Sequence, residues 1–384
     1  MPTAPRRVLT PSQGRVRHAV RTTIRRITRL EPLAFLGPPR RPAGTRPIVG
    51  VVGFYGPGNY GDELFLEVFR EHLGVDFDLR SIIDPANVTV GRLLGSGIRE
   101  AEAILIGGGD ILKPWPNGSR YWERAYLRRP VFVAGVGVPT WRPSTPESVA
   151  ELSAFFGHPN VRFVGARDAE SAAWIEANLR PAVRVATAPD LVCGLSLPAV
   201  RRPAGQPIFG VAVRSREQPD DLTNVRRLCE RAIELGYRVR RIVLATGRVR
   251  AQDAVATDGL GLPDTELVST DDLSEISRAI GECTTITSMK FHGVVVATMY
   301  GVPAIATMPT AKTRSFLGGI GRADLLAAYS NPELPSFLRP DLAPISDEIR
   351  DRLRHAAVAH LAELRERIAA TVGAAERATA HRGT

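Results

Sequence analysis

Short apolar runs recur along the chain from residue 47 to residue 307, and a glycine-rich or polar segment follows most of them. Ten runs have the length of a buried β-strand, at residues 47–54, 79–83, 103–106, 130–134, 161–164, 208–213, 239–245, 266–268, 283–287 and 303–307. Helical periodicity replaces this pattern between several runs, for example over Leu64–Leu73 and Leu222–Leu235. Strands that alternate with helices form parallel sheets, so the pattern predicts an α/β fold.

The alternating pattern is interrupted by a stretch rich in proline and arginine around residues 198–207, and it then begins again. A chain of 384 residues has the length of about two domains. Residues 347–375 place apolar side chains at helical spacing. The sequence therefore predicts a GT-B-like architecture, with Rossmann-like domains at residues 47–200 and 205–330, an interdomain cleft, and a long C-terminal helix at residues 345–376.

The net charge of +10 lies in the first 46 residues, which contain eleven arginines and one acidic residue, Glu31. The remaining 338 residues carry 39 basic and 39 acidic side chains. Over residues 14–30, apolar residues recur at helical spacing with arginines on the other faces, a pattern typical of a helix on an anionic membrane surface. A disordered extension without a specific partner is the alternative. Nucleic acid binding is disfavoured, because no aromatic platform or known binding module accompanies the charge.

The cysteines and the absence of long apolar runs indicate the compartment. Three cysteines, at positions 193, 229 and 283, lack the spacing of a disulfide framework or a zinc site, which favours a reducing environment. No apolar run approaches the roughly 18 to 20 residues of a membrane span, and the N-terminus lacks the apolar segment of a secretory signal. We therefore expect a cytoplasmic protein, peripheral at the inner face of the plasma membrane if the tail binds lipid.

The segment from Thr287 to Lys312 carries the most concentrated candidate chemistry. Its cluster SMKFHG follows an apolar run, as a loop does at the carboxyl end of a parallel strand, where ligands bind. Lys290 and His292 fall on this loop or in the first turn of the next helix. The chain has three lysines against 47 arginines, and lysine is a compact charge with a tunable pKa, so we interpret the two lysines as functional. The alternative is that Lys290 and Lys312 are ordinary surface lysines and that His292 is a core histidine whose hydrogen bonds are satisfied.

A glycine-rich loop follows the first strand of the first predicted domain. The loop GPGNYGDE, at residues 56–63, has the spacing of a dinucleotide-binding loop. Asn59 and Asp62, however, stand where bare backbone is usual, so the loop is weak evidence for NAD. We interpret Asp62 either as a helix N-cap or as a group that binds or deprotonates a sugar hydroxyl.

Charged residues end three further strands. Asp110 closes the cluster GGGD, which is too short to be specific alone. Arg167 follows a strand directly and is interpreted either as the partner of Asp168 or Asp190, or as an anion-binding residue. Arg214 ends its strand in the same way.

The order of these clusters resembles the polysaccharide pyruvyltransferase family over about residues 48–325. The clusters are GNYGDE, IGGGD, GVGVP, ARDAES with Asp190 after it, the strand that ends at Arg214, SMKFHG with GVP, and Lys312. The resemblance implies a GT-B fold and transfer of a pyruvyl group from phosphoenolpyruvate to a sugar of a cell-surface glycan or lipid-linked precursor, which forms a ketal and releases phosphate. The family's Arg-Leu-His cluster appears here as Lys290, Phe291 and His292, which keeps positive charge but loses the bidentate fork of arginine.

The resemblance, together with the chemistry of the donor, assigns roles to individual residues. Catalytic roles fall to His292, Lys312 and Arg167, donor-binding roles to Arg214, Lys290, Phe291 and Ser288, and acceptor-binding roles to Asn59, Asp62 and Asp110. Cations suit the carboxylate and phosphate of phosphoenolpyruvate, and a histidine with an ordinary pKa of about 6.5 exchanges protons near neutral pH. No metal or cofactor is required. The alternatives are a GT-B glycosyltransferase that uses a nucleotide sugar, and a non-catalytic member that binds a glycan or the membrane.

Overall fold

The computed structural model describes residues 44–82, 96–116, 118, 121–216, 221–262 and 265–381, without the side chains of residues 96, 97 and 375–381. The basic segment at residues 14–30 lies outside the described residues, as does Ile83 at the end of the second expected strand.

Six parallel strands form the first sheet, in the order β2-β1-β3-β4-β5-β6. The strands are β1 (Ile48–Val52), β2 (Asp78–Ser81), β3 (Ala103–Gly109), β4 (Val131–Val136), β5 (Val161–Ala166) and β6 (Val185–Thr187). The connecting helices are α2 (Tyr60–Leu73), α4 (Ser96–Glu100), α5 (Pro146–Phe156) and α6 (Ala169–Leu179), with short 3-10 turns η2 (Arg124–Arg128) and η3 (Leu191–Gly194).

Five parallel strands form the second sheet, in the order β11-β10-β7-β8-β9. The strands are β7 (Ile208–Ala212), β8 (Arg238–Ile242), β9 (Glu266–Val268), β10 (Thr285–Ser288) and β11 (Ala304–Ala306). The helices are α7 (Thr223–Glu234), α8 (Gly247–Asp258), α9 (Leu273–Gly281), α10 (Phe291–Met299) and α11 (Ala311–Gly319), followed by turns η4 (Ala323–Leu325) and η5 (Leu334–Phe337). The predicted GT-B-like α/β class is confirmed, while the expected boundaries at residues 47–200 and 205–330 stay a prediction.

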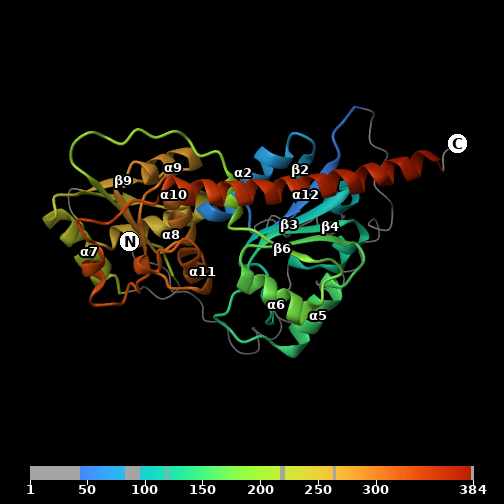
Figure 1. The fold of residues 1–384 in the computed structure, drawn as a ribbon, viewed down its shortest axis with the longest axis horizontal. Coiled ribbons are helices and arrows are strands. Elements are labelled where there is room, and N and C mark those ends of the chain that lie inside the picture. Colours follow the sequence, from blue (N-terminus) through green and yellow to red (C-terminus); the bar gives the residue numbers. More distant parts are fainter. Residues whose placement is uncertain are drawn as a thin grey trace, which may run out of the picture.

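The C-terminal helix α12 (Asp347–His381) runs along both sheets (Figure 1). It begins beside the second sheet, where the amide of Ile345 donates to the carbonyl oxygen of Gly301 at 3.1 Å. Farther along, its His360 ring packs on Phe163 of β5, with ring centroids 5.1 Å apart. Val358, expected on its apolar face, is 37% exposed. Within the described ranges, no helix is long and apolar enough to cross a membrane.

The glycines at residues 107–109 belong to β3, whereas the sequence suggested a loop there. The aromatic side chains of α2 lie directly on this strand. A Cβ atom on Gly107 would lie 2.7 Å from Cζ of Phe69 and 2.9 Å from the carbonyl oxygen of Ala134. Glycine therefore allows the strand to continue beneath a closely packed helix. The three-residue edge strand β6 was not predicted, because its apolar pattern is too short to stand out.

The order of strands reverses once in each sheet, between β1 and β3 in the first and between β7 and β10 in the second. Ligands of open parallel sheets bind at the carboxyl ends of strands beside such a reversal. The loop after β1 reaches the second sheet, because Asn59 forms an isolated antiparallel bridge with Ala245 and the amide of Thr246 donates to the carbonyl oxygen of Gly58 at 2.7 Å. The polar strand ends of the two sheets therefore meet.

Replacing Gly107 by alanine tests the close packing of α2 on β3. The added methyl group has no space, so we expect the free energy of unfolding to fall by about 1–3 kcal/mol, measured by urea unfolding. Gly318→Ala in α11 is the matched control, because a Cβ atom there meets nothing within 4 Å. Equal stability of the two variants would contradict this account of the strand.

Candidate active site

The N-terminus of α10 places three of the predicted residues side by side. Lys290 is its N-cap residue, and Phe291 and His292 are the first two helical residues. The Ser288 hydroxyl donates to the carbonyl oxygen of Lys290 at 2.8 Å and accepts from the Lys290 amide at 3.1 Å. Ser288 is buried and shapes this turn, so its contacts are structural, and its expected donor-binding role stays a prediction.

His292 faces a buried carboxylate. Its Nε2 lies 3.4 Å from Oδ2 of Asp190, whose side chain is fully buried. Burial alone would raise the pKa of Asp190, but the adjacent His292 and then Arg167 more than offset this and lower it. The other ring nitrogen packs against α2, since a Cβ atom on Gly61 would lie 1.7 Å from Nδ1. His292 is thus held between the two sheets. The sequence indicated Asp190 as a partner of Arg167 and as part of the family pattern, but not as the partner of His292.

Lys290 is largely enclosed by the protein, with 12% of its side chain exposed. Its Nζ lies 2.5 Å from Oδ2 of Asp253, and it donates to the carbonyl oxygen of Leu244 at 2.8 Å and to Oδ1 of Asn59 at 3.4 Å. Burial lowers the pKa of Lys290, and the neighbouring Asp253 opposes this shift. The surface-lysine alternative is therefore wrong for Lys290. Its ammonium group is engaged by both sheets, and no sequence signal had indicated Asp253.

Asp110, at the end of β3, joins two cations. One carboxylate oxygen pairs with Arg167, and the other lies 2.9 Å from Nζ of Lys312. Burial alone would raise the pKa of Asp110, but Arg167 and Lys312 hold it well below its usual range. Both cations also lie over the ring of Phe291, with Arg167 Cζ 5.6 Å and Lys312 Nζ 5.3 Å from its centroid. One carboxylate and one aromatic ring thus bring the two predicted catalytic cations together.

Arg167 has more hydrogen-bond donors than its acceptors use. It is 5% exposed, and besides Asp110 its Nε lies 3.6 Å from Oδ2 of Asp168. Burial tends to lower the pKa of Arg167, but the surrounding carboxylates, Asp110 first, raise it overall. Its Nη1 is buried and has no hydrogen-bond partner in the described part of the protein. The expected partner was Asp168 or Asp190, whereas Asp110 makes the closer pair.

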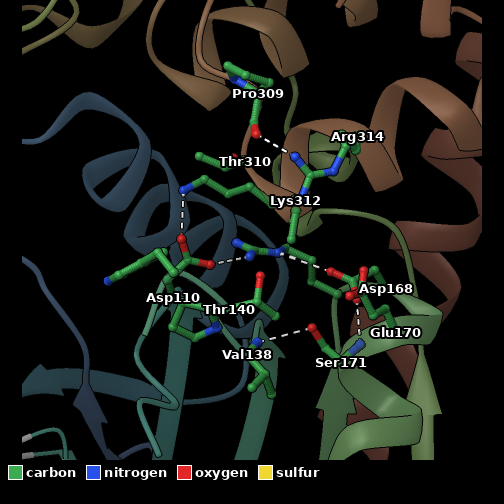
Figure 2. A pocket seen from close by; sticks show the side chains of 14 residues that line it. Asp110, Val138, Thr140, Asp168, Glu170, Ser171, Pro309, Thr310, Lys312 and Arg314 are labelled. Atoms are coloured by element: carbon green, nitrogen blue, oxygen red, sulfur yellow. Dashed lines mark hydrogen bonds and ion pairs between the residues drawn. The ribbon is translucent and has the colours of Figure 1, made fainter. Parts of the chain in front are cut away.

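A cavity of about 280 Å³ opens beside this cluster, between the two sheets (Figure 2). Its walls come from the ends of β3, β4 and β5, from the first turn of α6, and from the loop that precedes α11 together with the first turn of α11. The lining residues include Asp110, Thr140, Trp141, Arg167, Asp168, Glu170, Lys312 and Arg314. Figure 2 shows Lys312 extending from α11 to Asp110, so the two sheets contact each other at the cavity wall.

The glycine-rich loop before α2 does not present its amides to a ligand. The backbone amides of Gly56 and Gly58 donate to Oε1 of Glu63, at 2.8 and 3.0 Å. An internal carboxylate thus occupies the position that a phosphate takes in a dinucleotide-binding loop. Asn59 is the N-cap residue, so the N-cap interpretation of Asp62 is wrong. Asp62 instead accepts a hydrogen bond from the Asn59 side chain, and burial raises its pKa.

Arg214 is not brought into the cavity with Lys312. It is exposed at the end of β7 and lines a different cavity of about 440 Å³, beside α7 and α8. Its expected place in the same donor site as Lys312 therefore finds no support in these contacts. Among the residues that the structure describes, no cluster of histidine, cysteine and carboxylate side chains could hold a metal ion.

The fold and site define a GT-B-like α/β protein whose polar site lies between two parallel sheets. The model of the polysaccharide pyruvyl transferase family matches residues 59–308. The chain belongs to this family, which is a family of enzymes. No curated protein matches the chain.

Solved structures with a similar fold have low sequence identity. The UDP-GlcNAc 2-epimerase from Neisseria meningitidis bound to UDP-GlcNAc is 12% identical, with a TM-score of 0.51, over 83% of this chain and 99% of that chain. MnaA of S. aureus in complex with UDP is 10% identical, with a TM-score of 0.51, over 81% of this chain and 91% of that one. The UDP-GlcNAc 2-epimerase from Methanocaldococcus jannaschii is 11% identical, with a TM-score of 0.50, over 76% and 91%. These similarities establish the fold alone.

Replacing Lys290 by methionine tests the buried ion pair with Asp253. The change leaves a buried carboxylate without its cation, so we expect the free energy of unfolding to fall by about 3–5 kcal/mol. The double variant Lys290→Met, Asp253→Leu removes both charges and should recover about 1–3 kcal/mol relative to the sum of the single changes. Urea unfolding of all four proteins measures this coupling.

The exposed pair Arg226 and Glu230, with Nε and Oε1 3.0 Å apart, is the matched control. The corresponding cycle should give less than about 1 kcal/mol, because solvent screens this pair. Additive effects of the changes at Lys290 and Asp253 would contradict the coupling between these residues.

Proposed function

We propose that the protein transfers a pyruvyl group from phosphoenolpyruvate to two hydroxyl groups of one sugar, in a cell-surface glycan or its lipid-linked precursor. The products are a pyruvyl ketal and inorganic phosphate. The observation that carries this proposal is that Asp110 joins Arg167 and Lys312 at the meeting of the two sheets, while Asp190, the carboxylate that His292 faces, also acts on Arg167. Family membership supplies the reaction class, and the cluster supplies groups suited to it.

The donor fits best against the wall of the cavity formed by α11. Phosphoenolpyruvate carries a carboxylate and a phosphate, and the cavity-lining residues Lys312, Arg314 and Arg167 offer cationic groups to them. The amino end of α11 adds its backbone dipole, and its first turn contains no acidic residue. Lys290 forms an ion pair with Asp253, so we assign it a positioning role in place of the expected contact with phosphoenolpyruvate.

His292 is the group that we assign to proton transfer. The enol carbon of the donor gains a proton, and the neighbouring carbon is then attacked by one sugar hydroxyl, which loses its proton. Expulsion of phosphate and attack by the second hydroxyl complete the ketal, and one of the two hydroxyl protons leaves with phosphate. Asp190 faces the imidazole at 3.4 Å and would orient it for this role, as the partner of a general acid or base does. The acceptor-binding roles of Asn59, Asp62 and Asp110 stay predictions.

Replacing His292 by alanine should lower turnover about 10²–10⁴-fold, because the site loses its proton-transfer group. The assay follows phosphate release from phosphoenolpyruvate and the mass gain of one pyruvyl group on a glycan acceptor. His355→Ala is the matched control, since His355 is exposed on α12 and its Nδ1 contacts only the local carbonyl oxygen of Asp351.

Two results would overturn the proposal. Turnover of wild-type protein only with a nucleotide sugar would identify a glycosyltransferase. Glycan binding without turnover of any donor would identify a non-catalytic member of the family.

We also propose that residues 14–30 attach the protein to an anionic membrane surface. Support comes from the sequence, in which arginines flank an apolar helical stripe. Removing residues 1–44 should abolish sedimentation with vesicles that contain phosphatidylglycerol, and should leave turnover of a soluble acceptor unchanged. Neutral phosphatidylcholine vesicles are the control. Undiminished sedimentation of the truncated protein with the anionic vesicles would contradict this assignment.

A further inference from the structure

The cavity between the sheets has two chemically different sides. Lys312 and Arg314 lie on the side formed by α11, whereas Trp141 and Glu170 come from the first domain. The dianionic donor of the proposed reaction would pair with the cations Lys312, Arg314 and Arg167. It makes no use of Trp141 or Glu170.

Trp141 is an exposed aromatic residue in the cavity wall, with 56% of its surface accessible. Its ring packs against Trp115, with centroids 5.5 Å apart and planes inclined by 59°. Trp115 itself is only 7% exposed, so it gives Trp141 a fixed backing. An exposed indole held in place by a buried one is a rigid flat surface, which costs little conformational entropy when a ligand packs on it.

The surroundings of Trp141 suit a neutral polyol better than a second anion. Glu170, in the first turn of α6, and Asp168, its N-cap residue, place carboxylates on this side. Carboxylates repel phosphate but accept hydrogen bonds from hydroxyl groups. The aliphatic C–H face of a pyranose packs on an indole, while its ring hydroxyls remain free for such acceptors. Thr140 adds a hydroxyl group to the same wall.

We propose that Trp141, backed by Trp115, is the platform that binds the acceptor sugar, with Glu170 as a hydrogen-bond acceptor for its hydroxyl groups. This inference rests on the proposed pyruvyl transfer and names the acceptor side of that site. The platform and the cationic side line one cavity of about 280 Å³, so a sugar on Trp141 lies next to a donor held by Lys312. This placement brings two substrates of different charge together for ketal formation.

Kinetics of platform variants test the proposal. Trp141→Ala should raise KM for the glycan acceptor about tenfold, which corresponds to about 1.4 kcal/mol of lost binding free energy, and should leave KM for phosphoenolpyruvate within about twofold. Trp141→Phe keeps an aromatic face and should recover most of the affinity. Ile233→Ala, at an exposed apolar residue on α7, is the control for simple loss of apolar surface and should change neither constant. An unchanged acceptor KM, or equal increases for both substrates, would overturn the proposal.

A binding measurement separates failure of the platform from failure of the proposed reaction. Titration of the full-length protein with methyl glycosides of glucose, galactose, mannose and N-acetylglucosamine should change tryptophan fluorescence for at least one sugar, and Trp141→Phe should reduce the change. If phosphoenolpyruvate is not turned over but such a sugar binds, the proposed pyruvyl transfer is contradicted while sugar binding by Trp141 is supported. If no sugar in the panel binds, or if uridine monophosphate alone is bound through Trp141, the platform assignment is overturned.

Discussion

The arrangement of the candidate active site depends on the ion pairs that the Asp110 carboxylate makes with Arg167 and Lys312. Asp110 ends a strand of the first sheet and holds Arg167 with one oxygen and Lys312 of the second sheet with the other. A carboxylate this buried needs cations, because an unpaired charge away from water is strongly unfavourable. The pairing therefore makes the position of α11 relative to β3 part of the stability of the protein, and the wall of the cavity follows from it.

The other basic side chains of the candidate site are also paired with carboxylates from other elements. Lys290 of the α10 cap meets Asp253 of α8, and His292 meets Asp190, which precedes η3 of the first domain. Such pairs contribute little net stability compared with apolar packing, but they fix which groups lie together. In the proposed reaction, the groups assigned to proton transfer and donor binding would therefore be oriented before a substrate arrives, which is what electrostatic catalysis requires.

The sequence predicted most of the fold, because buried parallel strands are continuous apolar runs and loops follow their carboxyl ends. The candidates His292, Lys312 and Arg167 were predicted from the same pattern, and the structure brings Lys312 and Arg167 together at Asp110. Asp253 could not be found, since it lies within α8 and meets Lys290 only through the order of strands in the second sheet. Trp141 could not be predicted either, because a single tryptophan in a loop produces no sequence pattern. Only the structure shows that it packs against Trp115.

Lysine in place of the family's usual arginine at position 290 has a physical explanation in these contacts. Its single ammonium group contacts the Asp253 carboxylate, the backbone carbonyl oxygen of Leu244 and the side chain of Asn59 at the same time. A planar guanidinium needs more space and directs its donors in a fixed fork. Lys290 is already paired with Asp253, so Lys312, Arg314 and Arg167 are the cations that the described lining of the cavity offers to the proposed donor. Position 290 instead links the two sheets through the contacts of its ammonium group.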